Sequence, residues 1–175
     1  MNVSSGHRGL GLAKGGRLHH RTLVLRLFAE GKGVYAFPVR MVSAMLRESE
    51  LARLFHGRVP ADMERVQMLV NIPKKKQRRA VHRVLLRRRI KEAYRLHRAP
   101  LCRAAEAYRF PDGERGYMLL ALLYASDEIA DYATLEKKVV KLLDKAVEKL
   151  SESATHCAEA AAEEGKKTKA DGHSK

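Results

Sequence analysis

The sequence has 175 residues, 45% of them hydrophobic, and a formal net charge of +15, so its length supports one domain with a modest core and not two. The charge is concentrated, since residues 1–110 hold 25 Lys and Arg against 7 Asp and Glu, whereas residues 111–175 hold 10 against 13. A basic segment of that kind repels itself and is typical of a protein that binds a phosphate backbone, although a ribosome-like or surface-charged protein without a specific site stays open.

The first part of the chain predicts a leader, a helix and a strand. Residues 1–16 contain several Gly and lack the apolar core of a secretory signal, which indicates a flexible leader. Residues 17–32 predict a short helix with Gly31 at its C-cap. Residues 33–46 are rich in Val, Met and aromatic residues and predict a strand, in which Pro38 would occupy an edge or a bulge.

The middle of the chain predicts a loop, a second strand and a long basic helix. Residues 47–64 are polar and contain Gly and Pro, which indicates a loop that holds one helical turn or one further short strand. Residues 65–73 predict a strand that a proline stops. The segment KKKQRRAVHRVLLRRRIKEAYRLHR follows and predicts a helix of about five turns, from Arg78 or Arg79 to His97.

The last part of the chain predicts a turn, a buried strand, a helix and a tail. Residues 102–116 contain a Pro-Asp-Gly turn. Residues 117–125 are a continuous apolar run suited to a strand covered on both faces. Residues 126–150 predict an amphipathic helix. Residues 151–175 consist mainly of Ala, Glu and Lys, for which we expect a frayed helix end and then disorder.

These elements follow one another in the order α-β-β-α-β-α, with a possible third strand before the basic helix. Strands and helices at these spacings predict an α+β fold. We expect a two-layer sandwich in which a mixed sheet of about four strands packs with helices, as one RNA-binding domain over residues 17–150.

The basic helix carries its cations on one side. At 100° per residue, Arg83, Arg87, Lys91 and Arg95 follow one another at i+4 spacing, and Arg88 joins them. Like charges at this spacing repel, and a merely solvated helix would interleave acids, of which this helix has a single one, off the stripe. Apolar residues that can bury against a sheet lie roughly opposite: Leu86, Ile90, Ala93 and Leu96.

A folded helix with this stripe is suited to a polyanion. A nuclear-localisation tract would be disordered and would lack the apolar side. The preceding loop extends the patch with Lys74, Lys75 and Lys76 and leads into the positive N-terminal end of the helix, which is itself an anion site. Binding through such a surface would depend steeply on salt.

The order of strand, Lys-rich loop, Ala-Val and arginine-rich helix resembles the protein component of bacterial ribonuclease P. The family's helix motif runs approximately K-A-V-x-R-N-R-x-K-R-x-x-R-E, where this chain has RAVHRVLLRRRIKE. Three further segments are similar: LRLFAEGK to the end of the family's first helix, FPVRMV to its first strand, and YMLLALLYASDEIADYATLEKKVVKLL to its last strand and helix. The resemblance covers residues 17–150.

The resemblance implies a fold, an activity and partners. The family's fold is an α+β sandwich with an unusual left-handed βαβ crossover, against the right-handed rule. The family's protein is the subunit of a tRNA 5′-processing endoribonuclease whose catalytic RNA removes the leader of precursor tRNA. Mg²⁺ is then expected at the RNA active site, with no cofactor, metal or catalytic residue supplied by the protein. The RNA-binding residues implied are Lys74, Lys75, Lys76, Arg79, Arg83, Arg87, Arg88, Lys91 and Arg95.

The resemblance also implies a cleft for the precursor leader between the sheet and the first helix. Its candidate residues are Phe28, Tyr35, Phe37 and Arg40. A base stacked on an aromatic ring is worth roughly 1–3 kcal/mol. Ordinary core packing stays open for the three aromatic residues, whereas Arg40 stands among hydrophobic residues and suits a leader phosphate better than a core position.

The chain departs from the family motif at two positions. Where the family has Arg-Asn-Arg, this chain has Arg83-Val84-Leu85. Leu85 fits a buried side of the helix, whereas Val84 places an apolar group among the arginines. Either the remaining cations bind the RNA, or the chain is a diverged paralogue.

The remaining residues do not indicate a protein catalyst. A cluster of acids lies where a helix begins: Asp127, Glu128 and Asp131. Carboxylates there interact favourably with the positive end of the helix dipole, so we interpret them as capping residues and not as a metal site. Cys102 and Cys157 are far apart and predict free thiols in a reducing compartment. No apolar stretch approaches ~18 residues, so we expect no membrane span. We also expect a monomeric, cytoplasmic protein. The alternatives are a ribosomal or assembly-type RNA-binding protein without linked cleavage and, less favoured, a stand-alone metal nuclease.

Overall fold

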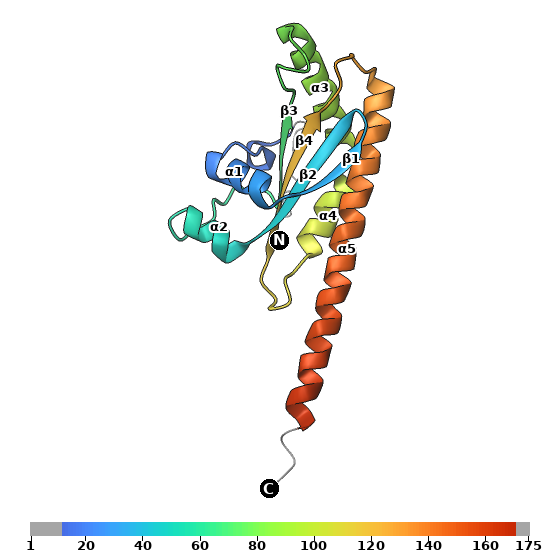
Figure 1. Ribbon diagram of the computed structural model, residues 1–175. Coiled ribbons are helices and arrows are strands. Elements are labelled where there is room, and N and C mark those ends of the chain that lie inside the picture. The colour runs from blue at the N-terminus through green and yellow to red at the C-terminus, as the bar shows by residue number, and fades with distance from the viewer. Residues whose placement is uncertain (1–11, 171–175) are drawn as a thin grey trace, which may run out of the picture.

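The computed structural model describes residues 12–170, with side chains for residues 12–152. Figure 1 shows a twisted sheet flanked by helices, with the last helix running past the end of the sheet. The elements in chain order are η1 (Lys14–Gly16), α1 (Arg21–Glu30), β1 (Lys32–Ala36), β2 (Val39–Arg47), α2 (Glu48–Leu54), β3 (Val66–Asn71), α3 (Ala80–His97), α4 (Ala99–Ala107), β4 (Gly116–Tyr124) and α5 (Tyr132–Ala170).

The four strands form one mixed sheet in the order β1-β2-β4-β3. β1 pairs with β2 and β2 with β4 in antiparallel fashion, whereas β3 and β4 are parallel. A parallel pair needs a long crossover, which α3 and α4 supply. The α+β fold with a mixed four-stranded sheet is thus confirmed, and the left-handed course implied for the crossover stays a prediction.

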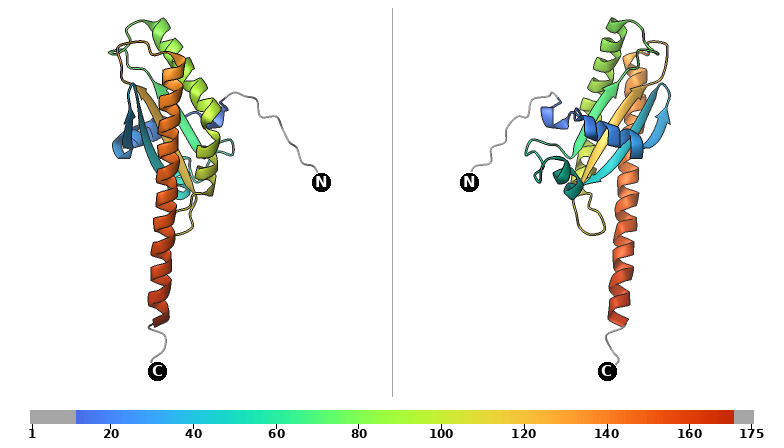
Figure 2. Two further views of the ribbon diagram at one scale, coloured as in Figure 1. Left: turned by 90° about the vertical axis from the view of Figure 1, so that its right-hand side faces the viewer. Right: turned by 60° about the vertical axis from the view of Figure 1, so that its left-hand side comes forward.

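Helices cover both faces of the sheet (Figure 2). The larger core lies between the sheet and α3, α4 and α5, and it includes Met118 and Leu120 of β4. A smaller core lies under α1 and α2 and includes Leu119 and Ala121 of the same strand. β4 is therefore buried on both faces, as its uninterrupted apolar run predicts.

Residues 12–16 differ from the flexible leader predicted for residues 1–16. They enter the body of the protein, where the carbonyl oxygen of Gly15 accepts a hydrogen bond from the buried amide of Gln67 at 3.1 Å. A Cβ at Gly15 would lie 1.6 Å from a backbone oxygen, so only glycine allows this close approach. Residues 1–11 lie outside the described part of the chain.

The single strand predicted over residues 33–46 is wrong, because the segment is a hairpin. β1 and β2 pair from Lys32 with Ser43 to Ala36 with Val39, and Phe37 and Pro38 form the turn between them. Pro38 therefore takes a turn position, where its missing N–H costs no ladder bond, and not an edge or a bulge within a strand.

α2 lies in the segment 47–64 that was predicted as a loop, and α4 is a helix that was not predicted. α2 holds more than the one turn predicted, and the Glu50 carboxylate caps its start by accepting the backbone N–H of Arg47 at 3.2 Å. α4 begins at Ala99 directly after α3, and Pro100 fits because proline is tolerated in the first helical turn.

α5 begins and ends later than predicted. Its first residue is Tyr132 and not residue 126, and it continues to Ala170, where the sequence predicted a frayed end beyond residue 150. Residues 171–175 lie outside the described part. Among the described residues, no helix combines the length and apolar character that a membrane crossing requires.

Candidate nucleic-acid interface

The basic helix α3 spans Ala80–His97 with Arg79 at its N-cap, close to the predicted limits. Burial of Leu86, Ile90 and Ala93 is confirmed, since all three are 0% exposed. Leu96 was predicted on the same side but is 51% exposed, and Tyr94 takes the buried position. The reason is helix geometry: relative to Ile90, Tyr94 is rotated by about 40° and Leu96 by about 120°.

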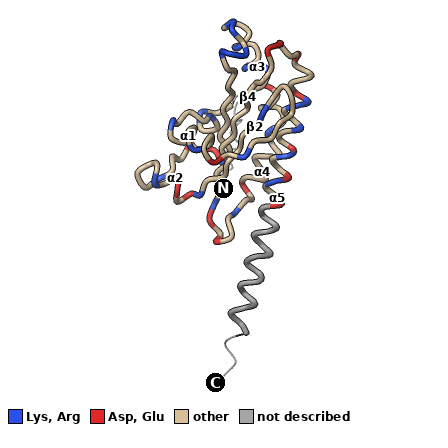
Figure 3. The backbone as a smooth tube through the Cα atoms, viewed as in Figure 1, with Lys and Arg blue, Asp and Glu red and all other residues tan. Residues whose placement is uncertain are grey.

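The solvent side of α3 carries cations that have no ion-pair partner in the described part of the chain. None of the ion pairs within residues 12–152 involves Arg87, Arg88 or Lys91. Figure 3 shows Lys and Arg continuing into the loop that precedes α3. Exposed cations of this surface are Lys74, Lys75, Arg78, Arg79, Arg88 and Lys91, and Arg87 is half-buried. This basic surface therefore offers several charges that the described part of the protein leaves uncompensated.

The loop before α3 is held in place by two of the predicted RNA-binding residues. Arg83 donates from Nη1 to the carbonyl oxygens of Gln77 at 2.9 Å and Arg78 at 2.6 Å. Lys76 forms an ion pair with Asp127 at 3.2 Å. The buried Gln77 amide donates to the Asp127 carbonyl oxygen at 2.7 Å, which ties the loop to the segment after β4. These two cations position the loop, while its exposed lysines face solvent.

A groove of about 510 Å³ runs along α3 between the first described residues and the start of α5. Arg17 donates to the Leu12 carbonyl oxygen at 3.0 Å, and Arg89 donates to the Ala130 carbonyl oxygen at 2.7 Å. Each guanidinium keeps further N–H donors for an anion. The groove is lined by Leu12, Arg17, Arg88, Arg89, Lys91, Glu92, Arg95 and Tyr132.

Arg95 is less available than its neighbours in this groove. It pairs with Glu92 at 2.6 Å, and the hydrogen bond from Arg95 lowers the pKa of that carboxyl. Both groups are solvent-exposed enough for the pair to contribute little to stability. An anion that approaches the groove would compete with Glu92 for the guanidinium, so Arg95 is less available to an anion than Arg88 or Lys91.

Sequence reasoning missed Arg17, Arg89 and Tyr132 as members of this interface. Arg17 forms an isolated backbone β-bridge with Met68 of β3, and Tyr132 is the first residue of α5. The groove is therefore lined by three separate parts of the chain: the first described residues, α3 and the start of α5. Their convergence depends on tertiary packing. Arg89 alone carried a signal, as the third arginine of an uninterrupted run in the basic helix.

The two positions that depart from the family motif are both at the surface. Val84 is 43% exposed and Leu85 is 38% exposed, so the buried side predicted for Leu85 is wrong. Val81, one turn earlier, is 76% exposed. Three neighbouring apolar side chains therefore stand next to cations on the solvent side of α3.

The leader candidates lie on the face of the sheet that α1 covers. Val39 and Met41 belong to the core on the other face, so Arg40 between them points toward the α1 side. Tyr35 pairs with Arg40 across the strands. The Arg40 guanidinium lies over β1, since a Cβ at Gly33 would come 2.9 Å from its Nη2.

Core packing is excluded for the three aromatic candidates. Phe28 is 47% exposed, Tyr35 54% and Phe37 58%. The rings of Tyr35 and Phe37 lie 6.4 Å apart at their centroids. The hairpin thus groups Tyr35, Phe37 and Arg40, whereas Phe28 stands on α1 without a ring contact to them within residues 12–152.

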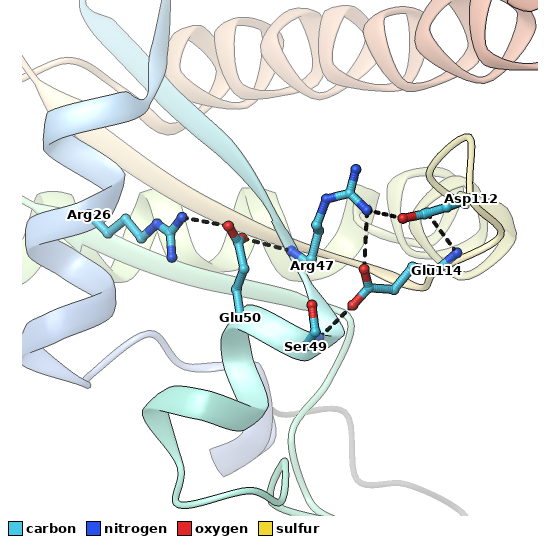
Figure 4. Close-up of polar contacts among 6 residues, drawn as sticks. All are labelled: Arg26, Arg47, Ser49, Glu50, Asp112 and Glu114. Atoms are coloured by element: carbon cyan, nitrogen blue, oxygen red, sulfur yellow. Dashed lines mark hydrogen bonds and ion pairs between the residues drawn. The ribbon is translucent and has the colours of Figure 1, made fainter.

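An ion-pair network fixes the end of the sheet beside α2 (Figure 4). The Arg47 guanidinium pairs with both Asp112 and Glu114, which lie in the turn before β4. Glu114 also accepts the backbone N–H of Ser49 at 2.6 Å. The hydrogen bond from Ser49, and after it the one from Arg47, lowers the pKa of the Glu114 carboxyl. The hydrogen bonds that Arg47 donates to Glu114 and Asp112 raise the pKa of its guanidinium.

The network reaches α1 through Glu50. This carboxylate accepts from Arg26 at 2.9 Å while capping α2, and Arg26 also pairs with Glu30 at 3.1 Å. The helix that carries Phe28 is thereby tied to α2 and to β2. The acids in this region are engaged in ion pairs and hydrogen bonds that hold the scaffold together.

The acidic cluster after β4 also has structural partners. Asp131 accepts the backbone N–H of Thr134 at 3.4 Å in the first turn of α5, and hydrogen bonding there lowers the pKa of the Asp131 carboxyl. Asp127 pairs with Lys76. The capping prediction is therefore confirmed for Asp131. Among the described residues, no group of three or more His, Cys, Asp or Glu could hold a metal ion.

A family model and two relatives identify the family of this chain. The family model described as Ribonuclease P matches residues 12–147. Two proteins named ribonuclease P protein component, from Porphyromonas gingivalis strains W83 and 2561, are each 32% identical over 133 residues, which cover 76% of this chain and 84% of theirs. Among solved structures, the RNase P protein of Thermotoga maritima matches with a TM-score of 0.49 at 17% identity, over 74% of this chain and 96% of its own. The Staphylococcus aureus RNase P protein matches with a TM-score of 0.49 at 12% identity, over 75% and 94%.

Proposed function

The chain belongs to the ribonuclease P protein family, and from that membership we propose that it binds the catalytic RNA of ribonuclease P through α3 and the preceding loop, residues 74–79. The observation that carries the proposal is the set of cations on α3 that no acid within residues 12–152 pairs with. Arg87, Arg88 and Lys91 stand on one side of a helix whose other side is locked in the core. A rigid row of charges recognises a phosphate backbone at little cost in side-chain and backbone entropy.

The same arrangement supports a division of labour within the basic surface. Arg83 and Lys76 hold the loop, so the exposed Lys74 and Lys75 are presented from a fixed backbone. We expect the loop to contact phosphates near the positive N-terminal end of α3. Each neutralised phosphate releases condensed counterions, so affinity should fall steeply with salt.

The leader of precursor tRNA is proposed to bind on the α1 face of the sheet. Tyr35 and Phe37 offer exposed rings for base stacking, and Arg40 lies next to them for a phosphate. Phe28 extends the same face from α1. In this arrangement the leader and the catalytic RNA contact different parts of the protein, so the protein can hold both at once.

Chemistry in this proposal belongs to the RNA. Mg²⁺ would be bound by RNA phosphates and would activate the attacking water and stabilise the leaving oxygen. Asp112 and Glu114 form ion pairs and Asp131 caps α5, and the proposal assigns no step to a protein side chain. The protein is expected to act as a monomer in the cytoplasm.

Reconstitution tests the proposal. A bacterial ribonuclease P RNA transcript is mixed with the protein, and precursor-tRNA cleavage is followed at low Mg²⁺. The protein should raise the cleavage rate and change nothing when the RNA is omitted. No stimulation would favour an RNA-binding protein without linked cleavage, and cleavage without RNA would favour a stand-alone nuclease.

A further inference from the structure

The basic surface contains an apolar patch that phosphate binding leaves unexplained. Val81, Val84 and Leu85 are 76%, 43% and 38% exposed. They lie three and four residues apart, so the three side chains are neighbours on one side of α3. Arg88 follows Val84 by four positions and Leu85 by three, so a cation that forms no ion pair within residues 12–152 borders the patch.

The surroundings of this apolar patch restrict what can cover it. Arg78 and Arg79 are exposed on the side that precedes it, and Arg87 and Arg88 follow it. A neutral apolar protein surface would bury those guanidiniums without partners, which is costly. A suitable occupant must place negative charge over the arginines and an uncharged, flat surface over the three side chains.

We propose that the apolar patch of Val81, Val84 and Leu85 binds the base and sugar of an unpaired nucleotide of the catalytic RNA, whose flanking phosphates contact Arg87 and Arg88. This inference rests on the proposed function and deepens it. A nucleotide has both surfaces, a charged phosphate and an uncharged base face, in one unit. The nucleotide must be unpaired, because in a duplex the base faces are stacked and RNA is then contacted through backbone and ribose.

The patch then gives this protein a contact of a different kind from its salt-dependent ones. Burying apolar area excludes water and releases no counterions. Its contribution to affinity should therefore be nearly independent of salt. The cations set the overall attraction to RNA, and the patch favours RNA that offers an unpaired nucleotide at the correct place.

The test uses the full chain and three variants. Val81→Thr and Val84→Thr are isosteric and Leu85→Gln keeps the length of the side chain, so the triple variant removes apolar surface without changing charge. Leu96→Gln, at a position 51% exposed on the same helix, is the matched control. Arg87→Gln with Lys91→Gln reports on the phosphate contacts. Affinities for a bacterial ribonuclease P RNA transcript and for a perfect RNA duplex are measured over a range of salt.

We expect the triple variant to bind the transcript about 15- to 60-fold more weakly, as the loss of two or three buried methyl groups would give. The slope of affinity against salt and the affinity for the duplex should not change, and Leu96→Gln should behave as wild type. Unchanged affinity for the transcript, or an equal loss on the duplex, overturns the inference. If Arg87→Gln with Lys91→Gln leaves the salt slope unchanged, the proposed function fails instead, whatever the triple variant does.

Discussion

Replacing Arg87 and Lys91 together with Gln tests whether α3 binds RNA through its phosphates. The two side chains lie four residues apart on the solvent side of the helix, and no ion pair within residues 12–152 involves either of them. Gln has a helix propensity close to that of Arg and Lys and keeps part of their aliphatic stem while removing the charge. The substitution should leave the fold intact, so that any loss of affinity reports on the interface.

The magnitude follows from counterion release. Each phosphate contact contributes about 0.7 to 0.9 to the slope of log affinity against log salt, so two lost contacts lower the slope by about 1.4 to 1.8. If the variant and the wild type bind equally at about 1 M salt, then one decade lower, at about 0.1 M, the variant should bind about 25- to 60-fold more weakly. That loss corresponds to about 2 kcal/mol of binding free energy.

Equilibrium binding to the RNA transcript, followed from about 0.05 to 0.5 M salt, measures both quantities. The control is Lys137→Gln with Lys141→Gln, which removes two exposed cations at the same spacing from α5. Its salt slope should equal that of the wild type. An unchanged slope in the α3 variant, or an equal decrease in the α5 control, would refute a phosphate interface centred on α3.

Three further predictions concern the leader face and the scaffold. Tyr35→Ala with Phe37→Ala should weaken binding of precursor tRNA about tenfold or more, since stacking contributes roughly 1–3 kcal/mol per base; an equal loss for tRNA without a leader would contradict the assignment. Gly31→Ala should lower the free energy of unfolding by about 1–3 kcal/mol, because its Cβ would lie 2.1 Å from a backbone oxygen and 2.6 Å from a valine methyl; an unchanged denaturant midpoint argues against this packing. The lowered pKa of Glu114 means that its contribution to stability is present above the carboxyl's ordinary pKa and is lost as pH falls through the lower folded value. Glu114→Gln should therefore flatten the decline of stability between about pH 6 and pH 3, and a decline as steep as in the wild type would show that Arg47 and Ser49 do not stabilise the ionised carboxyl.

Elements with a strong local pattern could be predicted from sequence. The limits of α3 follow from the periodic apolar residues and from the proline after it. The uninterrupted apolar run of β4 predicts a strand with both faces covered. In each case the signal lies within the element itself, and the structure confirmed the predicted element.

Features that depend on tertiary context could not be predicted in this way. The hairpin turn at Phe37 and Pro38 lies inside a run of strand-forming residues, so composition hid the break. Leu85 was assigned to the buried side because it is apolar, but on the wheel it is rotated by about 140° from Ile90, and it lies at the surface. Arg17 and Tyr132 line the groove only because the first described residues and the start of α5 lie beside α3.

The place of β4 in the sheet has a consequence for biosynthesis. β4 lies between β2 and β3 but follows both in the chain, and α3 packs mainly against α5, which comes last. As the chain leaves the ribosome, the cations of α3 emerge before the strand and the helix that cover its apolar side. Such non-local pairing forms late and slowly. The basic helix therefore gains its single-sided arrangement only when synthesis of the domain is nearly complete, and a prematurely terminated product would carry the same cations without the order needed to bind RNA selectively.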